Sequence, residues 1–140
     1  MPGTPLIRLL AILLIVQPLM GVDCYKDRPG CHSFLGIQNN GSKAIYFSLA
    51  FDSSLARLNY PPGNSPENYK CNAGTTGFLK SRGCLEGMTG SSGNIFIFLF
   101  DSDVIEGTSW ETVKQNRMLL ASYSLSIPQL DSLGWTIRYP

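Results

Sequence analysis

The sequence has few of the residues that enzymes use to move protons. It contains a single histidine, His32, whereas Ser-His-Asp and Cys-His sites both need a histidine to take and return a proton. His32 directly follows Cys31, and neighbours along a strand point to opposite faces. A catalytic Cys31–His32 pair would therefore need a bend, and we interpret it as a disulfide cysteine beside a strand-edge histidine.

Motifs for metals and nucleic acids are also missing. No two cysteines have the close Cys-x2-Cys spacing of structural zinc sites, and no EF-hand spacing occurs. Charged residues make up only 15% of the chain, and 11 Lys and Arg are balanced by 10 Asp and Glu. This balance gives no electrostatic attraction to nucleic acid or anionic membranes. We expect no cofactor, no metal and no nucleic-acid partner.

No apolar run is long enough to span a membrane, which takes about 20 residues. The longest run, Leu9–Val16, is ended by Gln17 and Pro18. Arg8 precedes it and the small residue Gly21 follows. A positive start, a short apolar stretch and a small-residue exit are typical of a secretory signal peptide. We predict an export signal in residues 1–23 and a single β-rich exported domain in residues 24–140.

The cleavage site has two interpretations. Cleavage after Gly21 would give a soluble secreted protein that begins at Val22. Alternatively, Cys24 becomes the lipid-modified first residue of a bacterial lipoprotein, which would attach the domain to a membrane of the cell envelope. Such signals usually place a small residue directly before the cysteine, where this chain has Asp23. Both interpretations stay open.

Four cysteines are candidates for disulfide bonds, because an exported chain meets oxidising conditions. They are Cys24, Cys31, Cys71 and Cys84. Four cysteines allow three connectivities, and sequence does not choose among them. Pairing of nearest neighbours, Cys24 with Cys31 and Cys71 with Cys84, would close short loops. If Cys24 carries lipid, one of the other three must be free.

The secondary-structure signals are mostly those of strands. Residues 94–100 form a continuous apolar run that predicts a central strand buried on both faces. Residues 44–51 alternate in hydrophobicity, as in a half-buried strand. The Asn-Gly pair at 40–41 favours a hairpin between that strand and one at 33–38. Further strands are expected at 77–80, 119–125 and 135–139, and capping patterns at Thr108 and Ser126 predict two short helices.

We expect a small antiparallel β-sandwich of immunoglobulin-like size with two short helices. The βαβ alternation of a parallel sheet is absent. The alternative is a single antiparallel sheet packed by the two helices.

Two regions could carry chemistry. Residues 52–74 form a long irregular segment, and such segments are often functional. We take its Tyr60 and Tyr69 as binding-loop candidates, whereas Trp110, Trp135 and Tyr139 fit core or edge packing. Carboxylates gather at Asp101, Asp103 and Glu106. They could bind calcium, act as the acid and base of a glycosidase or belong to a solvated turn.

The C-terminal stretch resembles a known group of proteins. Residues 101–140 combine an acidic turn after a Phe-rich strand, a Ser-Trp-Glu helix start and the ending Trp-Thr-Ile-Arg-Tyr-Pro, and Asn-Asn-Gly-Ser-Lys-Ala-Ile-Tyr-Phe occurs earlier. These segments look like those of small exported proteins of Bacteroides-type gut bacteria, many of them lipoproteins, with no assigned activity. The resemblance covers about two-thirds of residues 24–140. It implies a lipid on Cys24 and supplies no catalytic residue.

We therefore expect a non-enzymatic module of the cell envelope or cell surface, lipid-anchored or secreted, that binds an envelope protein or a glycan or supports an assembly. One alternative is a small secreted hydrolase that uses carboxylates. Another is a disulfide-stapled protein of the inhibitor or immunity type.

Overall fold

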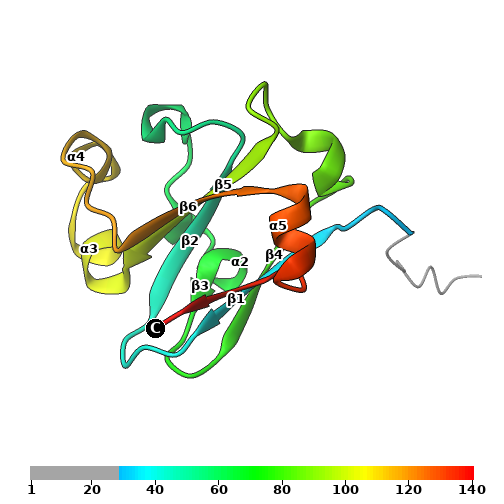
Figure 1. Ribbon diagram of the computed structural model, residues 1–140. Helices are drawn as coiled ribbons and strands as arrows, with labels where there is room; N and C mark the ends of the chain where they lie inside the picture. Colours follow the sequence, from blue (N-terminus) through cyan, green and yellow to red (C-terminus); the bar gives the residue numbers. More distant parts are fainter. Residues whose placement is uncertain (1–28) are drawn as a thin grey trace, which may run out of the picture.

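Seven short strands form two sheets in the computed structural model, which describes residues 29–140 (Figure 1). The predicted export signal and Cys24 lie outside the described residues. The strands are β1 (Phe34–Asn39), β2 (Ile45–Ala50), β3 (Lys70–Cys71), β4 (Thr76–Lys80), β5 (Asn94–Asp101), β6 (Ala121–Ser126) and β7 (Thr136–Tyr139). The predicted small, mainly β fold is confirmed.

The three-stranded sheet has the order β4-β1-β7 and the four-stranded sheet the order β3-β2-β5-β6. Every pair is antiparallel except β1 with β7, which run parallel. The two sheets are thus mostly antiparallel, as expected, and β1 with β7 is the one parallel pair. Parallel neighbours need a long connection, and here nearly the whole domain lies between the two strands.

The expected hairpin between the first two strands does not form, because β1 and β2 belong to different sheets. Asn39 explains the change of sheet. Its side chain is fully buried, and its Nδ2 donates to the carbonyl oxygens of Lys43 at 2.7 Å and Cys71 at 3.2 Å. Its Oδ1 accepts the N–H of Gly41 at 3.0 Å. The Asn39 amide thus bonds main-chain groups of the turn, as Asn does in Asx turns. The chain then crosses to the second sheet.

Strand β5 is central in its sheet, as predicted, and is buried on both faces. Ile95, Ile97 and Leu99 face the core between the two sheets. Phe98 and Phe100 face a second core on the other side. Strand β2 is also buried on both faces, so the prediction that it is half-buried is wrong. A second apolar layer explains the difference, because it covers the face that would otherwise meet water.

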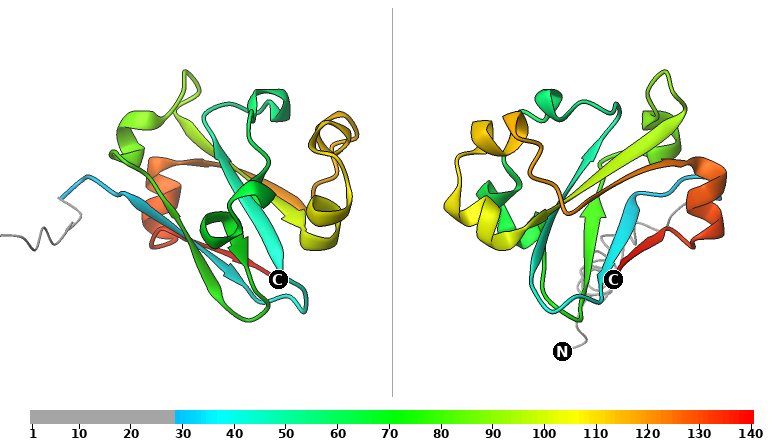
Figure 2. Two further views of the ribbon diagram at one scale, coloured as in Figure 1. Left: turned by 180° about the vertical axis from the view of Figure 1, so that it is seen from behind. Right: turned by 60° about the vertical axis from the view of Figure 1, so that its left-hand side comes forward.

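Four short α-helices complete the described part of the chain: α2 (Pro66–Tyr69), α3 (Ser102–Gly107), α4 (Trp110–Gln115) and α5 (Ile127–Ser132). Two of them, α4 and α5, were predicted. Helix α5 begins at the expected capping box of Ser126 and Gln129, whereas α4 is capped by Ser109 rather than Thr108. In the right-hand view of Figure 2, α3 and α4 lie on one side of the four-stranded sheet and the three-stranded sheet on the other.

None of the helices within residues 29–140 has the length and apolar character needed to cross a membrane.

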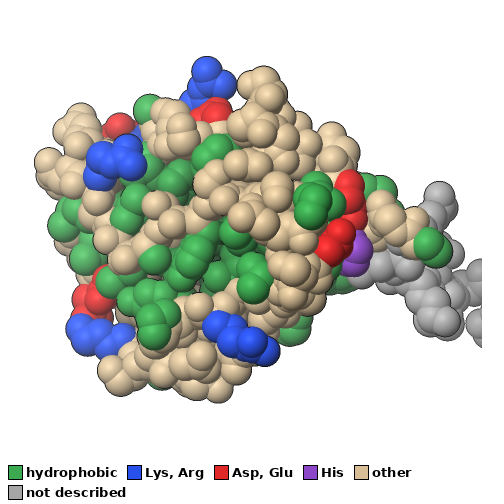
Figure 3. All heavy atoms as spheres, viewed as in Figure 1, with side chains coloured by type: hydrophobic (Ala, Val, Ile, Leu, Met, Phe, Trp, Pro, Cys, Tyr) green, Lys and Arg blue, Asp and Glu red, His purple; other side chains and the backbone are tan. Residues whose placement is uncertain are grey.

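The two sheets spread apart between their outer strands β6 and β7. Half-buried side chains from these strands, Tyr123, Leu125 and Tyr139, pack against the core there. Figure 3 shows hydrophobic side chains gathered in the middle of this face, with Lys and Arg side chains around its margin. The sandwich is therefore open along this side.

Candidate functional site

The long segment after β2 is not irregular, as the sequence suggested, but folds into short turns of helix. They are η2 (Leu55–Arg57), η3 (Pro62–Asn64) and α2. Trp110 holds the segment in place, because its indole N–H donates to the carbonyl oxygen of Leu58 at 3.1 Å. The indole ring also packs edge-on against Phe100, with centroids 5.5 Å apart. The segment is thus fixed over the four-stranded sheet and brings its tyrosines to one place.

Tyr60 and Tyr69 line the same pocket, which has a volume of about 360 Å³. Leu49 of β2 and Leu79 of β4 lie inside it, so it opens between the edges of the two sheets. Strand β3 pairs only with Ile45 and Tyr46 of β2. On that edge the second half of β2 therefore has no neighbouring strand, although β5 pairs with its other edge. We call this site the tyrosine pocket; its lining includes Leu49, Phe51, Arg57, Tyr60, Tyr69, Leu79, Lys80, Leu85 and Met88.

The rim of the tyrosine pocket is apolar and faces solvent. Tyr60 is 81% exposed, and Phe51, Tyr69 and Met88 are each between 37% and 39% exposed. Isolated exposed apolar residues are ordinary, but a contiguous group often marks an interaction site. Four such side chains around one hollow therefore single out this pocket among the described residues.

The two tyrosines are held differently. The ring of Tyr69 packs edge-on against the core residue Phe47, with centroids 6.3 Å apart, and its position at the end of α2 is fixed by a bond from its N–H to the carbonyl oxygen of Ser65 at 3.1 Å. Tyr60 has most of its surface in water. Tyr69 is thus a fixed platform, and Tyr60 is a side chain that a ligand could cover.

Polar groups on the pocket wall could orient a ligand. Arg57 pairs with Asp52 at 3.0 Å, yet its side chain remains 78% exposed. Lys80 and Asn59 also line the pocket. A concave apolar surface with a few polar groups is the usual composition of a binding site.

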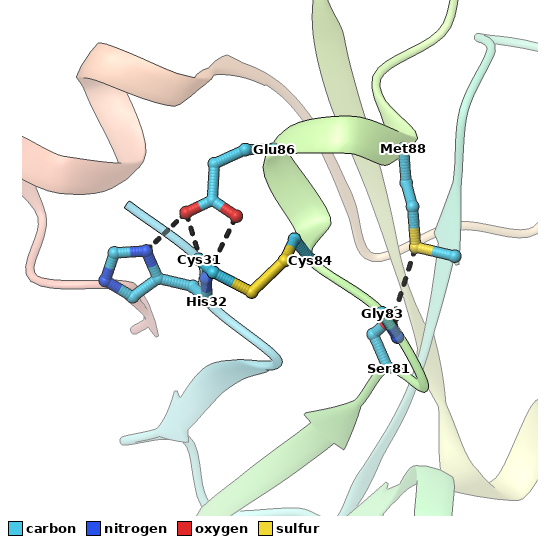
Figure 4. The surroundings of a disulfide bond; sticks show 7 residues. All are labelled: Cys31, His32, Ser81, Gly83, Cys84, Glu86 and Met88. Atoms are coloured by element: carbon cyan, nitrogen blue, oxygen red, sulfur yellow. Dashed lines mark hydrogen bonds and ion pairs between the residues drawn. A yellow bond between two sulfur atoms is a disulfide. The ribbon is translucent and has the colours of Figure 1, made fainter. Parts of the chain in front are cut away.

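A disulfide between Cys31 and Cys84 lies beside another wall of the pocket (Figure 4), with a Cα–Cα distance of 4.8 Å. It precedes the 3-10 helix η4 (Leu85–Met88), whose Leu85 and Met88 line the pocket. The N–H of Leu85 donates to the carbonyl oxygen of His32 at 2.8 Å. The link therefore joins the start of β1 to the wall of the pocket. This pairing also differs from the nearest-neighbour arrangement of cysteines.

His32 and Glu86 form hydrogen bonds with each other next to the disulfide. Glu86 accepts the backbone N–H of His32 at 2.9 and 3.0 Å and contacts the ring Nδ1 at 2.5 Å. The ring stacks on Trp135 with centroids 4.0 Å apart. Burial would raise the pKa of Glu86, but the hydrogen bonds from His32 outweigh it and lower that pKa. The carboxylate is therefore a structural acceptor, and Cys31 has no free thiolate for a catalytic pair.

Cys71 forms no disulfide, so its assignment as a bridge residue is wrong. Its thiol is free and buried. The sulfur lies 3.4 Å from the carbonyl oxygen of Ile37 and 3.2 Å from that of Thr75. It thus packs between the two sheets, and Cys84 pairs with Cys31.

The acidic cluster is spread over helix α3, and each carboxylate has a separate structural partner. Asp101 caps the helix by accepting the N–H of Asp103 at 2.8 Å. Asp103 pairs with Lys43 at 2.8 Å. Glu106 pairs with Lys70 at 2.6 Å and accepts the hydroxyl of Tyr46 at 3.0 Å. These bonds lower the pKa of Asp103 and of Glu106, so both side chains remain ionised.

Glu106 also borders a second hollow of about 430 Å³, beside Ile105 and Trp110. The three carboxylates do not converge as metal ligands. Within residues 29–140 the one group that meets metal-ligand distances is Cys31, Cys84 and Glu86, and there both sulfurs are consumed by the disulfide. The carboxylates Asp101, Asp103 and Glu106, which in the sequence suggested a possible calcium site, therefore serve in helix capping and ion pairs.

Phe51, Leu85 and Met88 were not identified from sequence as lining residues. Phe51 belongs to the predicted strand 44–51, and Leu85 and Met88 lie in a Gly- and Ser-rich stretch for which no strand or helix is predicted. A useful signal was Cys84, because a bridge to Cys31 brings residues 85–88 beside the start of β1.

Comparison with protein-family models, with curated proteins and with solved structures found no match to this chain.

Proposed function

We propose that the chain is an exported, non-enzymatic binding module of the cell envelope or cell surface, and that the tyrosine pocket holds its ligand. The observation that carries this proposal is the convergence of Tyr60 and Tyr69 with Phe51 and Met88 around one pocket between two sheet edges. Function of this kind sits on loops carried by a rigid scaffold. The scaffold here is tied on one side by the disulfide and on the other by Trp110.

The ligand proposed for this pocket is an envelope protein segment or a glycan. Aromatic faces pack on flat or apolar surfaces, and where the partner is itself an aromatic ring each pair contributes about 0.5–1.5 kcal/mol beyond its buried area. Arg57, Asn59 and Lys80 add donors at the wall. The pocket volume of about 360 Å³ lies within the range of roughly 300–1,000 Å³ that ligand sites commonly enclose, which supports a short saccharide or peptide as the ligand.

The proposed absence of catalysis is supported by the state of the carboxylates. A glycosidase needs one carboxylic acid with a raised pKa, whereas Asp103 and Glu106 have lowered pKa values. Each also has a lysine partner at its carboxylate. The hydrolase alternative is thus less well supported than binding.

A lipid on Cys24 is part of the proposal. With Cys31 and Cys84 joined and Cys71 buried in β3, a bridge from Cys24 would have to reach a residue that is only 1% exposed. Cys24 would therefore remain available for acylation, in keeping with the resemblance to exported lipoproteins. A secreted form that begins near Val22 is the other outcome.

The experiment compares the Tyr60→Ala/Tyr69→Ala variant with Phe78→Ala, which removes an aromatic ring that is 60% exposed but lies outside the pocket lining. Both are screened against an oligosaccharide panel and used to capture proteins from a cell-envelope extract. We expect the tyrosine variant to lose binding on the order of tenfold, since two stacked contacts are removed, and Phe78→Ala to keep it. Equal binding by both variants would reject the pocket. One partner captured by both would favour an inhibitor or immunity role.

A further inference from the structure

The outer edge of β6 is open to pairing with another strand. It is the last strand of the four-stranded sheet (Figure 1). The bond from the N–H of Ser102 to the carbonyl of Ala44 sets the alternation along β5. Residues 96, 98 and 100 bond to β2, and residues 95 and 97 bond to β6 at its residues 125 and 123. The main-chain groups of Ser122 and Ser124 therefore point outward, because antiparallel ladders alternate by one residue.

The β6 edge lacks the charges and prolines that protect many edge strands. Natural edge strands are blunted by charges, prolines or covering elements, yet residues 118–130 contain no charged residue and β6 contains no proline. Ser122 and Ser124 are exposed, and no backbone hydrogen bond from another described residue reaches them on the outer side. By contrast, β4 ends in Lys80 and β7 contains Arg138.

We propose that a second copy of this chain pairs with β6 through its own β6, antiparallel and about a two-fold axis. The outward groups of Ser122 and Ser124 set the register. Ser122 of one copy would exchange both hydrogen bonds with Ser124 of the other, and the axis would pass through Tyr123. A two-fold interface of this kind is self-complementary, and it joins two four-stranded sheets into one continuous sheet.

The charged residues on either side of β6 also favour a second copy of this chain as the partner. Arg117 precedes β6 and Asp131 follows it in α5, and both are exposed. In an antiparallel pair the start of one strand lies beside the end of the other, so Arg117 of each copy faces the acidic end of its mate. No like charges meet along the strand itself, because it has none. Opposite charges across strands stabilise a pair and like charges oppose it.

The proposed pairing also brings the Tyr123 side chains of the two copies together. Tyr123 is half-buried at the open side of the sandwich, and burial raises the pKa of its hydroxyl, with a further rise from neighbouring Tyr139. At the axis the two copies of Tyr123 would lie directly opposite in a non-hydrogen-bonded pair, where side chains approach closely. Aromatic pairs across strands are among the stabilising ones.

The first experiment measures molar mass by light scattering over a concentration series of the mature chain. Ser122→Lys/Ser124→Lys places lysines opposite each other in the proposed register. Ser91→Lys/Ser92→Lys adds the same charge on the turn before β5, outside the proposed strand pairing, and each variant loses one exposed hydrogen bond to Asn94. We expect dimers for the wild type and the control, and at least a tenfold weaker dimer for the β6 variant, with an unchanged melting temperature at a concentration low enough for all three proteins to be monomers. A monomeric wild type, or a β6 variant that dimerises like the control, would overturn the proposal.

A second experiment tests the register. Ser122→Cys and Ser124→Cys proteins are mixed and oxidised. Hydrogen-bonded partners have Cα atoms about 5.5 Å apart, within the range that disulfides bridge. Cross-linking should therefore be stronger in the mixture than in either protein alone. Equal or absent cross-linking in the mixture would overturn this pairing, and neither result depends on a ligand in the tyrosine pocket.

Discussion

The carboxylate of Glu86 accepts the backbone N–H of His32 through both of its oxygens, at 2.9 and 3.0 Å. These residues are 54 apart in sequence, and the disulfide beside them joins Cys31 to Cys84. The contact therefore closes the same loop as the covalent link. It positions η4, and with it one wall of the tyrosine pocket.

Removal of the disulfide should destabilise the domain. We expect the Cys31→Ser/Cys84→Ser variant to lose about 2–4 kcal/mol of unfolding free energy, because the link closes a loop of 53 residues. Urea denaturation with and without reductant measures this. The reductant should weaken the wild type and leave the variant unchanged, since Cys71 is already a free thiol. An equal effect of reductant on both proteins would contradict the assigned bridge.

Acid should weaken the contact between Glu86 and His32 and so lower the stability of the domain. The pKa of Glu86 is lowered in the folded state from its ordinary value of 4.5, so its contribution to stability is complete above that value. It is lost as the pH falls through the lower, folded pKa. We expect Glu86→Gln to reduce stability at neutral pH and to remove part of the acid dependence, measured as melting temperature between pH 7 and 3. Parallel curves for the two proteins would contradict this role.

The mass of the mature protein tests the proposed lipid. If Cys24 is acylated, the native protein should begin at Cys24 and carry the mass of acyl chains. Reduction should add two hydrogens, for the Cys31–Cys84 bridge alone. Thiol titration in denaturant before reduction should find one free thiol, Cys71. A lipid-free mass that begins near Val22 would mean a secreted domain.

Gly77 of β4 packs against the four-stranded sheet with no room for a side chain. A Cβ at this position would lie 2.9 Å from a ring carbon of Phe47 and 3.1 Å from the Cβ of Cys71. We expect Gly77→Ala to destabilise the domain by about 1–3 kcal/mol, the usual cost of overpacking a core. Gly83→Ala is the control, because nothing lies within 4 Å of its Cβ position. Chemical denaturation of both variants checks this, and equal stabilities would refute tight packing at Gly77.

Local patterns were sufficient to predict the strongest elements. The apolar run of β5 and the capping box at Ser126 depend on neighbouring residues alone, so they could be identified directly. The helix α3 was missed because its start, Asp101-Ser102-Asp103, has the composition of a turn. The hairpin at Asn40-Gly41 was predicted wrongly, because Asn39 finds a buried acceptor on Cys71, which lies 32 residues further along the chain.

The sequence by itself determined the class of fold, the central strand and the two tyrosines of the long segment, since hydrophobic period and composition are local properties. Only the tertiary structure decided which cysteines pair, which sheet each strand joins and that Tyr60, Tyr69 and Met88 surround one pocket. These features depend on contacts between residues tens of positions apart. Such contacts are chosen by how two sheets and their covering helices pack together, and no short segment carries that information.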